Sequence, residues 1–327
     1  MYKLILLVFP IAVLLGCQGG GTSSEPDKNP ETEVTPPNLS EDDVVLKLDA
    51  NRASIYIKGA DPLSNKWLEY EIVRFQSEKH NADIWRINNL YQASASELNY
   101  PFHFIRDYQG RSLTTNGEWD KAILEKGAGD FIGGAHGDEK LSTFYIKVDG
   151  KEVDGQDKKT YISDTVELHQ TTDLFSWYDK STLAKTSRTY KFHRDGVNVH
   201  QKMEWKDAAS LKTSYLAMFP VLRTMNEGEF QVTDTAWYWP DGHVQDISIP
   251  GFKIQQYKQD EIWVEGAESG LRAEIKIERT PRLEGFSSFV TNSPAYNKVY
   301  FDITGAHDTK AGEVWETNTQ YKITTYK

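Results

Sequence analysis

The chain has 327 residues, a formal net charge of −11 and a single cysteine. One cysteine excludes an intramolecular disulfide, so the stability of the fold must come from a hydrophobic core. No basic stripe, P-loop, dinucleotide fingerprint, Gly-x-Ser-x-Gly, His-Glu-x-x-His or EF-hand pattern occurs. These absences argue against nucleic acid as a partner, against a nucleotide cofactor and against a metal centre. We therefore expect no cofactor, although the acidic loops leave room for structural calcium.

The N-terminal residues have the layout of a secretory signal. Residues 4–15 are apolar but too few to span a bilayer, and they lead into Leu14-Leu-Gly-Cys17. This end resembles the lipobox of bacterial lipoproteins, and the resemblance implies removal of residues 1–16 and lipidation of Cys17. The alternative is a simple signal peptide with an unrelated cysteine. Gln18 resembles the outer-membrane sorting pattern, so we expect an outer-membrane lipoprotein at the cell surface or facing the periplasm.

The composition changes after Cys17. Between Gln18 and Asp43 there are seven acidic residues, one lysine and no aromatic residue. Such a segment predicts a disordered acidic tether over residues 17–43, which contacts the membrane through the lipid alone. Residues 44–327 contain no linker and no repeat of fixed period, so we expect one catalytic domain that is a monomer.

Short segments with alternating apolar and polar residues recur through this domain, separated by turn residues. Helical periodicity is scarce, and residues 120–126 form the best short helix candidate. The pattern predicts an all-β fold, an antiparallel β-sandwich of the jelly-roll type. The predicted strands are 44–48, 54–58, 68–75, 84–87, 141–148, 161–172, 174–178, 187–194, 197–205, 211–220, 231–239, 247–254, 261–265, 271–278, 296–303 and 312–323.

Asp195-Gly196 between two alternating segments predicts a β-hairpin. A two-residue turn at Asp195-Gly196 places Arg194 opposite Val197 and Lys191 opposite His200. Residues that pair share one side of the sheet. One face then carries the core residues, and the other carries Lys191, His193, Asn198, His200 and Lys202.

The second hairpin face has two interpretations. It is either a solvated outer surface or a cationic groove, with Lys191, His200 and Lys202 as candidates to bind an anionic polysaccharide. Arg223, at the end of the next apolar strand, is a further candidate for binding acidic groups.

Five glycines surround His136 between Gly127 and Glu139. Glycine is unfavourable in helix and strand interiors, so this segment predicts a loop that approaches something closely. An imidazole there can act as a general base, with Asp138 and Glu139 placed to orient it. The alternative is a glycine-rich turn with an incidental histidine.

Trp237-Tyr-Trp239 alternates along a predicted strand, which places both indoles on one face and the phenol on the other. Large aromatic side chains most often fill β cores, and this is one interpretation. The other is that Trp237 and Trp239 stack on sugar rings.

The export signal, the strand pattern and the His, Tyr and basic residues together resemble the β-jelly-roll polysaccharide lyases, which include alginate, glucuronan and ulvan lyases. The resemblance implies β-elimination on a polymer that contains uronic acid. That reaction needs a group to neutralise the carboxylate, a base for the C5 proton and an acid for the leaving oxygen. We assign His136 as the base or neutralising group and Tyr215 as the phenol that transfers the proton.

Two other functions remain open. A glycoside hydrolase needs two facing carboxylates, and the adjacent Asp138 and Glu139 make a poor pair, so another acid such as Glu204 would be required. A noncatalytic surface glycan-binding lipoprotein would use the aromatic and basic residues without a positioned histidine.

Overall fold

The computed structural model describes residues 39–40, 42–58, 66–97, 102–115, 117–155, 158–225 and 228–326. These residues lie in one compact unit, Pro37–Lys327. Within them, helical structure is confined to short 3₁₀ turns such as η1 (Tyr108–Gly110) and η2 (Gly134–His136). No helix in this part of the chain is long and apolar enough to cross a membrane. Cys17 and the predicted tether up to residue 38 lie outside the described residues.

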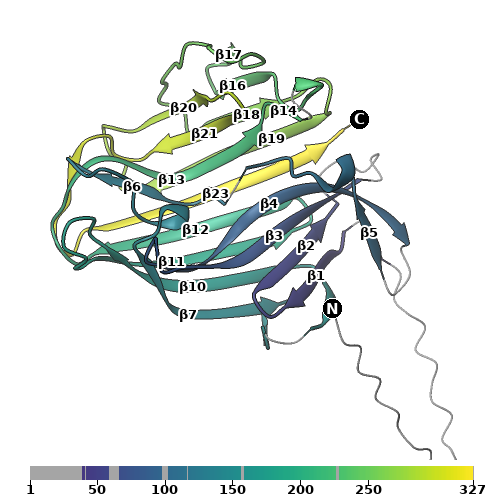
Figure 1. The fold of residues 1–327 in the computed structure, drawn as a ribbon, viewed down its shortest axis with the longest axis horizontal. Helices are drawn as coiled ribbons and strands as arrows, with labels where there is room; N and C mark the ends of the chain where they lie inside the picture. Colours follow the sequence, from purple (N-terminus) through teal and green to yellow (C-terminus); the bar gives the residue numbers. More distant parts are fainter. Residues whose placement is uncertain are drawn as a thin grey trace, which may run out of the picture. The chain divides into compact units, whose positions relative to one another are not determined.

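One long sheet runs through the molecule in the order β17-β16-β18-β19-β23-β12-β11-β10-β7-β4-β3-β2-β1-β9, with β5 paired to β4 and β8 to β7 (Figure 1). Neighbouring strands in this sheet are antiparallel, except that β4 and β7 pair in parallel, at only two residue pairs. The strands are β1 (Val44–Asp49), β2 (Arg52–Ile57), β3 (Lys66–Ser77), β4 (Ala82–Glu97), β5 (His103–Arg106), β7 (Glu139–Val148), β8 (Lys151–Val153), β9 (Thr160–Ser163), β10 (Val166–Phe175), β11 (Thr182–His193), β12 (Gly196–Trp205), β16 (Thr235–Trp239), β17 (His243–Asp246), β18 (Glu261–Glu265), β19 (Leu271–Thr280) and β23 (Val314–Thr325).

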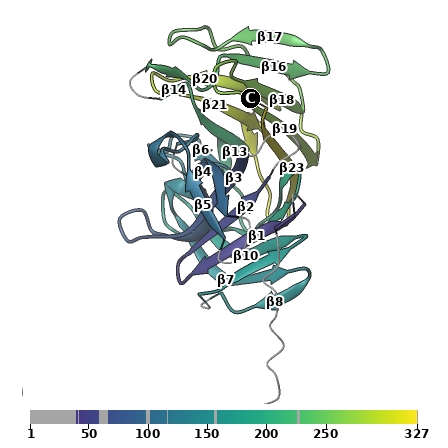
Figure 2. The same ribbon diagram turned by 90° about the vertical axis from the view of Figure 1, so that its right-hand side faces the viewer.

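The sheet folds back on itself at the short β4–β7 contact, so β1–β4 lie across the inner side of β10 and β11 (Figures 1 and 2). Gln170 of β10 connects the two layers. Its side chain accepts the N–H of Trp85 in β4 at 3.0 Å and donates to the Trp85 carbonyl at 2.5 Å. Two layers therefore face each other even though they belong to one sheet.

A second sheet, β20-β21-β13-β22 with β6 on β13, covers the inner side of β12 and β23. Gln201 of β12 donates to the Leu216 carbonyl at 2.6 Å, and the Tyr321 hydroxyl of β23 donates to the Met218 carbonyl at 3.1 Å. The Trp119 ring packs between Phe219 and Tyr321. The strands are β6 (Ala122–Glu125), β13 (Ser210–Leu222), β20 (Ser287–Asn292), β21 (Tyr296–Asp302) and β22 (His307–Asp308), and β14 (Thr224–Met225) pairs with β15 (Phe230–Gln231).

Strands β10, β16, β18, β19 and β23 alternate between buried and more accessible residues along most of their length. This alternation gives the long sheet an inner face in the core and an outer face that is wet, as expected for antiparallel sheets. The prediction of an all-β fold built as an antiparallel sandwich is confirmed.

Three predicted elements are wrong. Residues 174–178 do not form a separate strand, because Leu174 and Phe175 belong to the end of β10 and the chain turns after them. Residues 120–126 form β6 and not a helix, because the backbone of Ala122–Glu125 pairs with the edge of β13 and this tertiary contact overrides local propensity. Residues 247–254 do not form a strand. Ile247 is buried and Phe252 packs against the core while partly exposed, whereas Ile249 and Ile254 are exposed and Pro250-Gly251 interrupts the segment.

The hairpin of β11 and β12 exists, but its register differs from the prediction. His193 pairs with Gly196, Lys191 with Asn198 and Thr189 with His200, so the turn is Arg194-Asp195. Gly196 therefore belongs to β12. Its φ is +145°, and a Cβ there would lie 2.1 Å from the Tyr321 carbonyl oxygen of β23. The glycine permits close strand approach, and the two-residue change in register leaves both predicted faces intact.

Replacement of Gly196 by alanine should therefore cost more than backbone strain alone. We expect about 1–2 kcal/mol from the positive φ and a further ~1–3 kcal/mol from the overlap with β23, measured by urea unfolding. Gly150→Ala is the control, because Gly150 also has a positive φ but a Cβ added there would meet no atom within 4 Å. Equal losses in the two variants would contradict the close-approach explanation.

Candidate functional site

A buried ion network joins the two layers beneath the glycine-rich loop. The Lys121 Nζ lies 2.7 Å from Glu139 Oε1, and Arg188 Nη2 lies 3.3 Å from the same oxygen. Arg188 also pairs with Asp120, whose Oδ2 accepts the Tyr190 hydroxyl at 2.9 Å. All four charged side chains are at most 1% exposed. Their charges are therefore compensated inside the core, as buried charges must be.

The network shifts the pKa values of its members. Burial alone would raise the pKa of Glu139, but Lys121 and Arg188 outweigh it and lower this pKa to about 2. Burial lowers the pKa of Lys121 to about 8, against the opposing effect of Glu139. At neutral pH Glu139 is therefore a carboxylate held by two cations.

Glu139 also anchors the glycine-rich loop, because its Oε2 accepts the Gly134 N–H at 2.7 Å. The loop lies tightly against its own chain. Gly137 has φ +97°, and a Cβ there would lie 1.9 Å from the His80 carbonyl oxygen. The predicted close approach is thus made to other segments of this protein, and it fixes the position of η2, which ends at His136.

His136 is partly exposed, with its Nε2 3.7 Å from Glu118 Oε1 and its Nδ1 4.0 Å from Asp130 Oδ1. Burial lowers its pKa, and Glu118 opposes this effect, so the imidazole is neutral at pH 7. The prediction that Asp138 and Glu139 orient His136 is wrong. Asp138 instead pairs with Lys180 at 2.8 Å, and Glu139 belongs to the buried network.

His136 and Tyr215 belong to one group of side chains. Phe131 links them, with its ring centroid 5.1 Å from that of His136 and 5.8 Å from that of Tyr215. The ring centroids of Tyr215 and Tyr300 lie 4.5 Å apart. Lys298 Nζ lies 4.7 Å from the Tyr300 ring centroid and pairs with Glu118. We call this group the His136 cluster; its members are Glu118, Phe131, His136, Tyr215, Lys298 and Tyr300.

Burial raises the pKa values of Tyr215 and Tyr300 and lowers that of Lys298. The cluster thus combines a neutral imidazole with two protonated phenols. Glu118, Lys298 and Tyr300 were missed in the sequence, because no local pattern joins residue 118 to β21.

The outer face of the long sheet carries the predicted lysines and histidines, but acids from neighbouring strands compensate two of them. Lys191 pairs with Glu167 of β10 at 2.9 Å, and His200 pairs with Glu316 of β23 at 2.7 Å. Lys202 lies on the same face. The face therefore has mixed charge, because β10 and β23 flank the hairpin and contribute their own acids.

Three tryptophans gather at one end of this face. Trp237 and Trp239 are partly exposed on the outer side of β16, while Tyr238 between them is buried and donates to Gln245 Oε1 at 2.8 Å. The predicted division of indoles and phenol is correct. Trp263 of β18 lies beside them, with its ring centroid 5.0 Å from that of Trp239. The alternation of apolar and polar residues in Glu261–Glu265 could have predicted that Trp263 lies on the outer face.

Two neighbouring cavities open on this part of the outer face. The larger, about 460 Å³, is lined by Trp239, Trp263, Glu261 and Lys276 among others. The smaller, about 130 Å³, is polar and shares Lys276 with the first. Its other lining residues are Asn198, Glu278, Asn318 and Gln320.

The register explains why these residues meet. Asn198 of β12 pairs with Gln320 of β23, which pairs with Lys276 of β19. Lys276 pairs with Glu261 of β18, which pairs with Trp239 of β16. All five side chains thus form one row that runs across the strands. We call this surface, with the three tryptophans and both cavities, the tryptophan groove.

Arg223 lies away from the outer face and lines a separate cavity of about 500 Å³, and its role in binding stays a prediction. It is 1% exposed, and its guanidinium donates to the Ile247, Ser293 and Pro294 carbonyls and to Asn297 Oδ1. The side chain ties β14 and its neighbouring loops together. Burial lowers its pKa.

The remaining predictions concern other parts of the chain. Glu204, the alternative acid, pairs with Lys206 on the surface. Lipidation at Cys17 stays a prediction. Within the residues that the structure describes, no three His, Cys, Asp or Glu side chains are grouped to hold a metal ion.

No protein-family model and no curated protein matches the chain. Among solved structures it is similar to a glycoside hydrolase family 97 enzyme from Pseudoalteromonas sp. strain K8, with a TM-score of 0.43 and 12% identity over 83% of this chain and 36% of that enzyme. The chain thus spans about a third of that enzyme's length.

It is also similar to a galactose mutarotase-like protein from Clostridium acetobutylicum, with a TM-score of 0.45, 8% identity and coverage of 88% and 100% of the two chains. A putative mutarotase from Salmonella typhimurium gives a TM-score of 0.38, 9% identity and coverage of 89% and 97%. These neighbours are β-rich, carbohydrate-related proteins, and none is described as a lyase. Every TM-score is below 0.5, so these similarities assign no function, and the function of this chain must be inferred from its own residues.

The buried network yields a stability prediction. Glu139→Gln should lower the free energy of unfolding at pH 7 by about 3–5 kcal/mol, because buried Lys121 loses its closest carboxylate and Arg188 keeps only Asp120. The folded-state pKa of Glu139 is depressed, so its contribution is present above pH 4.5 and is lost as pH falls toward about 2.

Urea unfolding of both proteins between these pH values is the measurement. The difference between wild type and Glu139→Gln should shrink as the pH falls. Glu204→Gln, which removes one partner of an exposed pair, is the control and should change stability little. A difference that does not depend on pH would contradict the assignment of charge to Glu139.

Proposed function

We propose that this protein binds an extended saccharide across the outer face of its long sheet. The observation that carries the proposal is the tryptophan groove. Trp239 and Trp263 line its larger cavity, Trp237 stacks beside Trp239, and the smaller polar cavity adjoins the larger one at Lys276. Aromatic surface provides apolar contact for sugar rings, and a few convergent polar groups fix orientation in most ligand sites. Here the amides of Asn198, Asn318 and Gln320 offer both donors and acceptors for hydroxyl groups.

A second row of polar side chains extends the groove toward the other edge of the layer. It runs from Glu278 and Asn318 through His200 and Thr189 to His169 and ends at Tyr145 of β7. The Tyr145 ring stacks on His169 with centroids 4.6 Å apart. From β18 to β7 there are six strand steps, which at about 4.8 Å each give a track of about 29 Å. Such a length suits a chain of sugars more than a single one.

Trp239→Ala should weaken polysaccharide binding roughly 30-fold, the effect of removing about 2 kcal/mol at a binding hot spot. Affinity electrophoresis against a panel of neutral and acidic polysaccharides measures this. Trp177→Ala is the matched control, because Trp177 is also a partly exposed indole but contacts Lys180 away from the groove. Equal retardation of both variants and wild type would refute the groove as the binding surface.

A second candidate function is β-elimination at the His136 cluster, on an anionic polysaccharide. It is supported by the grouping of His136 with Tyr215 and by the direction of their pKa shifts. Neutral His136 would take the C5 proton, the bond from C4 to the glycosidic oxygen would break, and the Tyr215 phenol would protonate that oxygen. Lys298 would neutralise the uronate, provided that the substrate carboxylate displaces Glu118.

His136→Ala should abolish such cleavage and leave the thermal melt largely unchanged, since the imidazole is partly exposed and contributes little to the core. The rise in ultraviolet absorbance from an unsaturated uronate, with alginate, glucuronan, ulvan and pectate as substrates, is the readout. Tyr215→Phe should also reduce the rate. A retained rate in His136→Ala would remove this residue from the mechanism, and no cleavage by wild type would leave the protein as a glycan-binding protein.

A further inference from the structure

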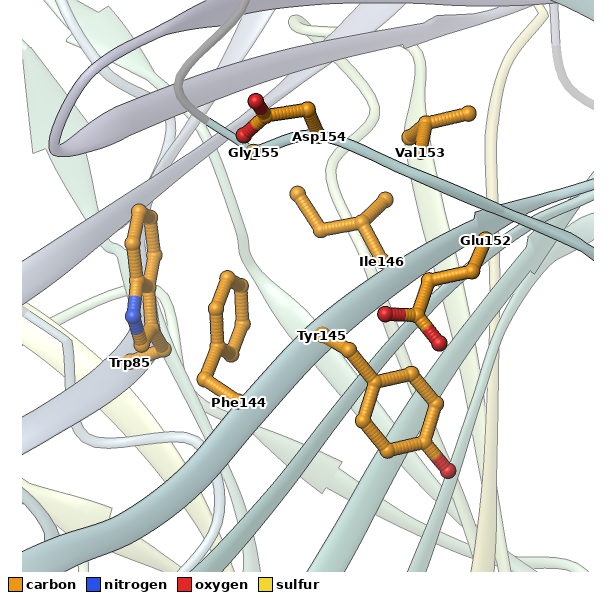
Figure 3. Close-up of a pocket in the computed structure, with 8 residues that line it drawn as sticks. All are labelled: Trp85, Phe144, Tyr145, Ile146, Glu152, Val153, Asp154 and Gly155. Atoms are coloured by element: carbon orange, nitrogen blue, oxygen red, sulfur yellow. The ribbon is translucent and has the colours of Figure 1, made fainter.

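A cavity of about 510 Å³ lies at the β7 edge of the long sheet, away from the three tryptophans (Figure 3). The cause is a gap in strand pairing. One side of β7 pairs with β10. The opposite side pairs with β4 only at Glu139 and Lys140, and with β8 only from Ile146 to Val148. Between these contacts the edge of β7 has no paired strand among the residues that the structure describes. Trp85 of β4 and the segment after β8 form the walls.

One wall of this cavity is aromatic. The Trp85 and Phe144 rings stack with centroids 4.3 Å apart and an interplanar angle of 7°. Figure 3 shows the two rings side by side, with Ile146 next to them. Trp85 is 4% exposed, and its backbone is held by Gln170. The wall is therefore rigid and can receive the apolar face of a ligand without rearrangement.

The other side of the cavity is acidic. The carboxylates of Glu152 and Asp154 line it, and no Lys, Arg or His is among its lining residues. Lys147 lies opposite Glu152 in the β7–β8 pairing, but its Nζ lies 5.3 Å from the centre of the Tyr145 ring. No ion pair within 4 Å forms between Lys147 and Glu152. Glu152 therefore lines the cavity without an ion pair to Lys147.

We propose that this cavity is a second ligand site, which takes a small sugar that carries a protonated amino group. The volume lies within the range of small-molecule sites, roughly 300–1,000 Å³. The aromatic wall contacts the apolar face of the ring, and the Glu152 carboxylate forms a charge-assisted hydrogen bond with the ammonium. A uronate is repelled by the same carboxylate, so the site discriminates by charge. This site does not depend on the tryptophan groove.

The test is an NMR titration of the protein with glucosamine, glucose and glucuronate at neutral pH. Glucosamine should bind at least about tenfold more tightly than glucose, since a charged hydrogen bond is stronger than a neutral one. Glucuronate should bind more weakly than glucose. Equal or tighter binding of glucuronate, or no binding of glucosamine, overturns the proposal.

Two variants locate the site. In Gly155→Leu the new Cβ lies 3.6 Å from Ile146 Cδ1 and 3.9 Å from Phe144 Cε1, which are ordinary contacts, and the rest of the side chain occupies the cavity. This variant should lose glucosamine binding, and full retention refutes the site.

Glu152→Gln should reduce glucosamine affinity to the level of glucose while leaving glucose unchanged, and it needs no change in packing. Glu284→Gln, an exposed carboxylate on another part of the surface, is the control and should bind like wild type. A preference for glucosamine that survives Glu152→Gln refutes the role of the carboxylate. Trp239→Ala should leave glucosamine binding intact, which separates this site from the groove.

Discussion

The carboxylate of Glu139 connects more of this structure than any single apolar contact that we describe. One oxygen is held by Lys121 before β6 and by Arg188 of β11, and the other accepts the Gly134 N–H of the glycine-rich loop. These partners come from both layers of the sandwich. A buried carboxylate with two cations requires all of them in place, because any one left alone would be an uncompensated charge in the core. The position of η2, and with it His136, follows from this requirement.

The outer face depends on a different constraint, the period of two along each strand. Once the inner side chains of β10, β12, β23 and β19 are buried, the residues between them must point outward. The register then determines which residues meet across strands. The tryptophan groove arises in this way from residues of β12, β23, β19, β18 and β16, which are separated in sequence by intervals of up to about 120 residues.

The sequence predicted what depends on alternation. Most strands of the long sheet, the sandwich, the buried hairpin face that carries Tyr190 and the division of Trp237 and Trp239 from Tyr238 follow from local pattern. Strands such as β5, β6, β8 and β20 were not predicted. The sequence also did not predict what depends on contacts between distant segments. Arg223 is charged and follows an apolar strand, yet four backbone and side-chain acceptors bury it. Glu118 lies near His136 although it is distant in sequence. Asp138 and Glu139, which are close to His136 in sequence, are instead paired with Lys180 and Lys121.

We propose that saccharide binds on the outer face at the tryptophan groove. The most direct measurement is the ¹⁵N NMR spectrum of the indole N–H groups, recorded with and without oligosaccharides of increasing length from a polymer that the protein retards. We expect the signals of Trp237, Trp239 and Trp263 to shift together, by an amount that grows with the length of the oligosaccharide. Shifts confined to other indoles, such as Trp177 or Trp67, would contradict this proposal.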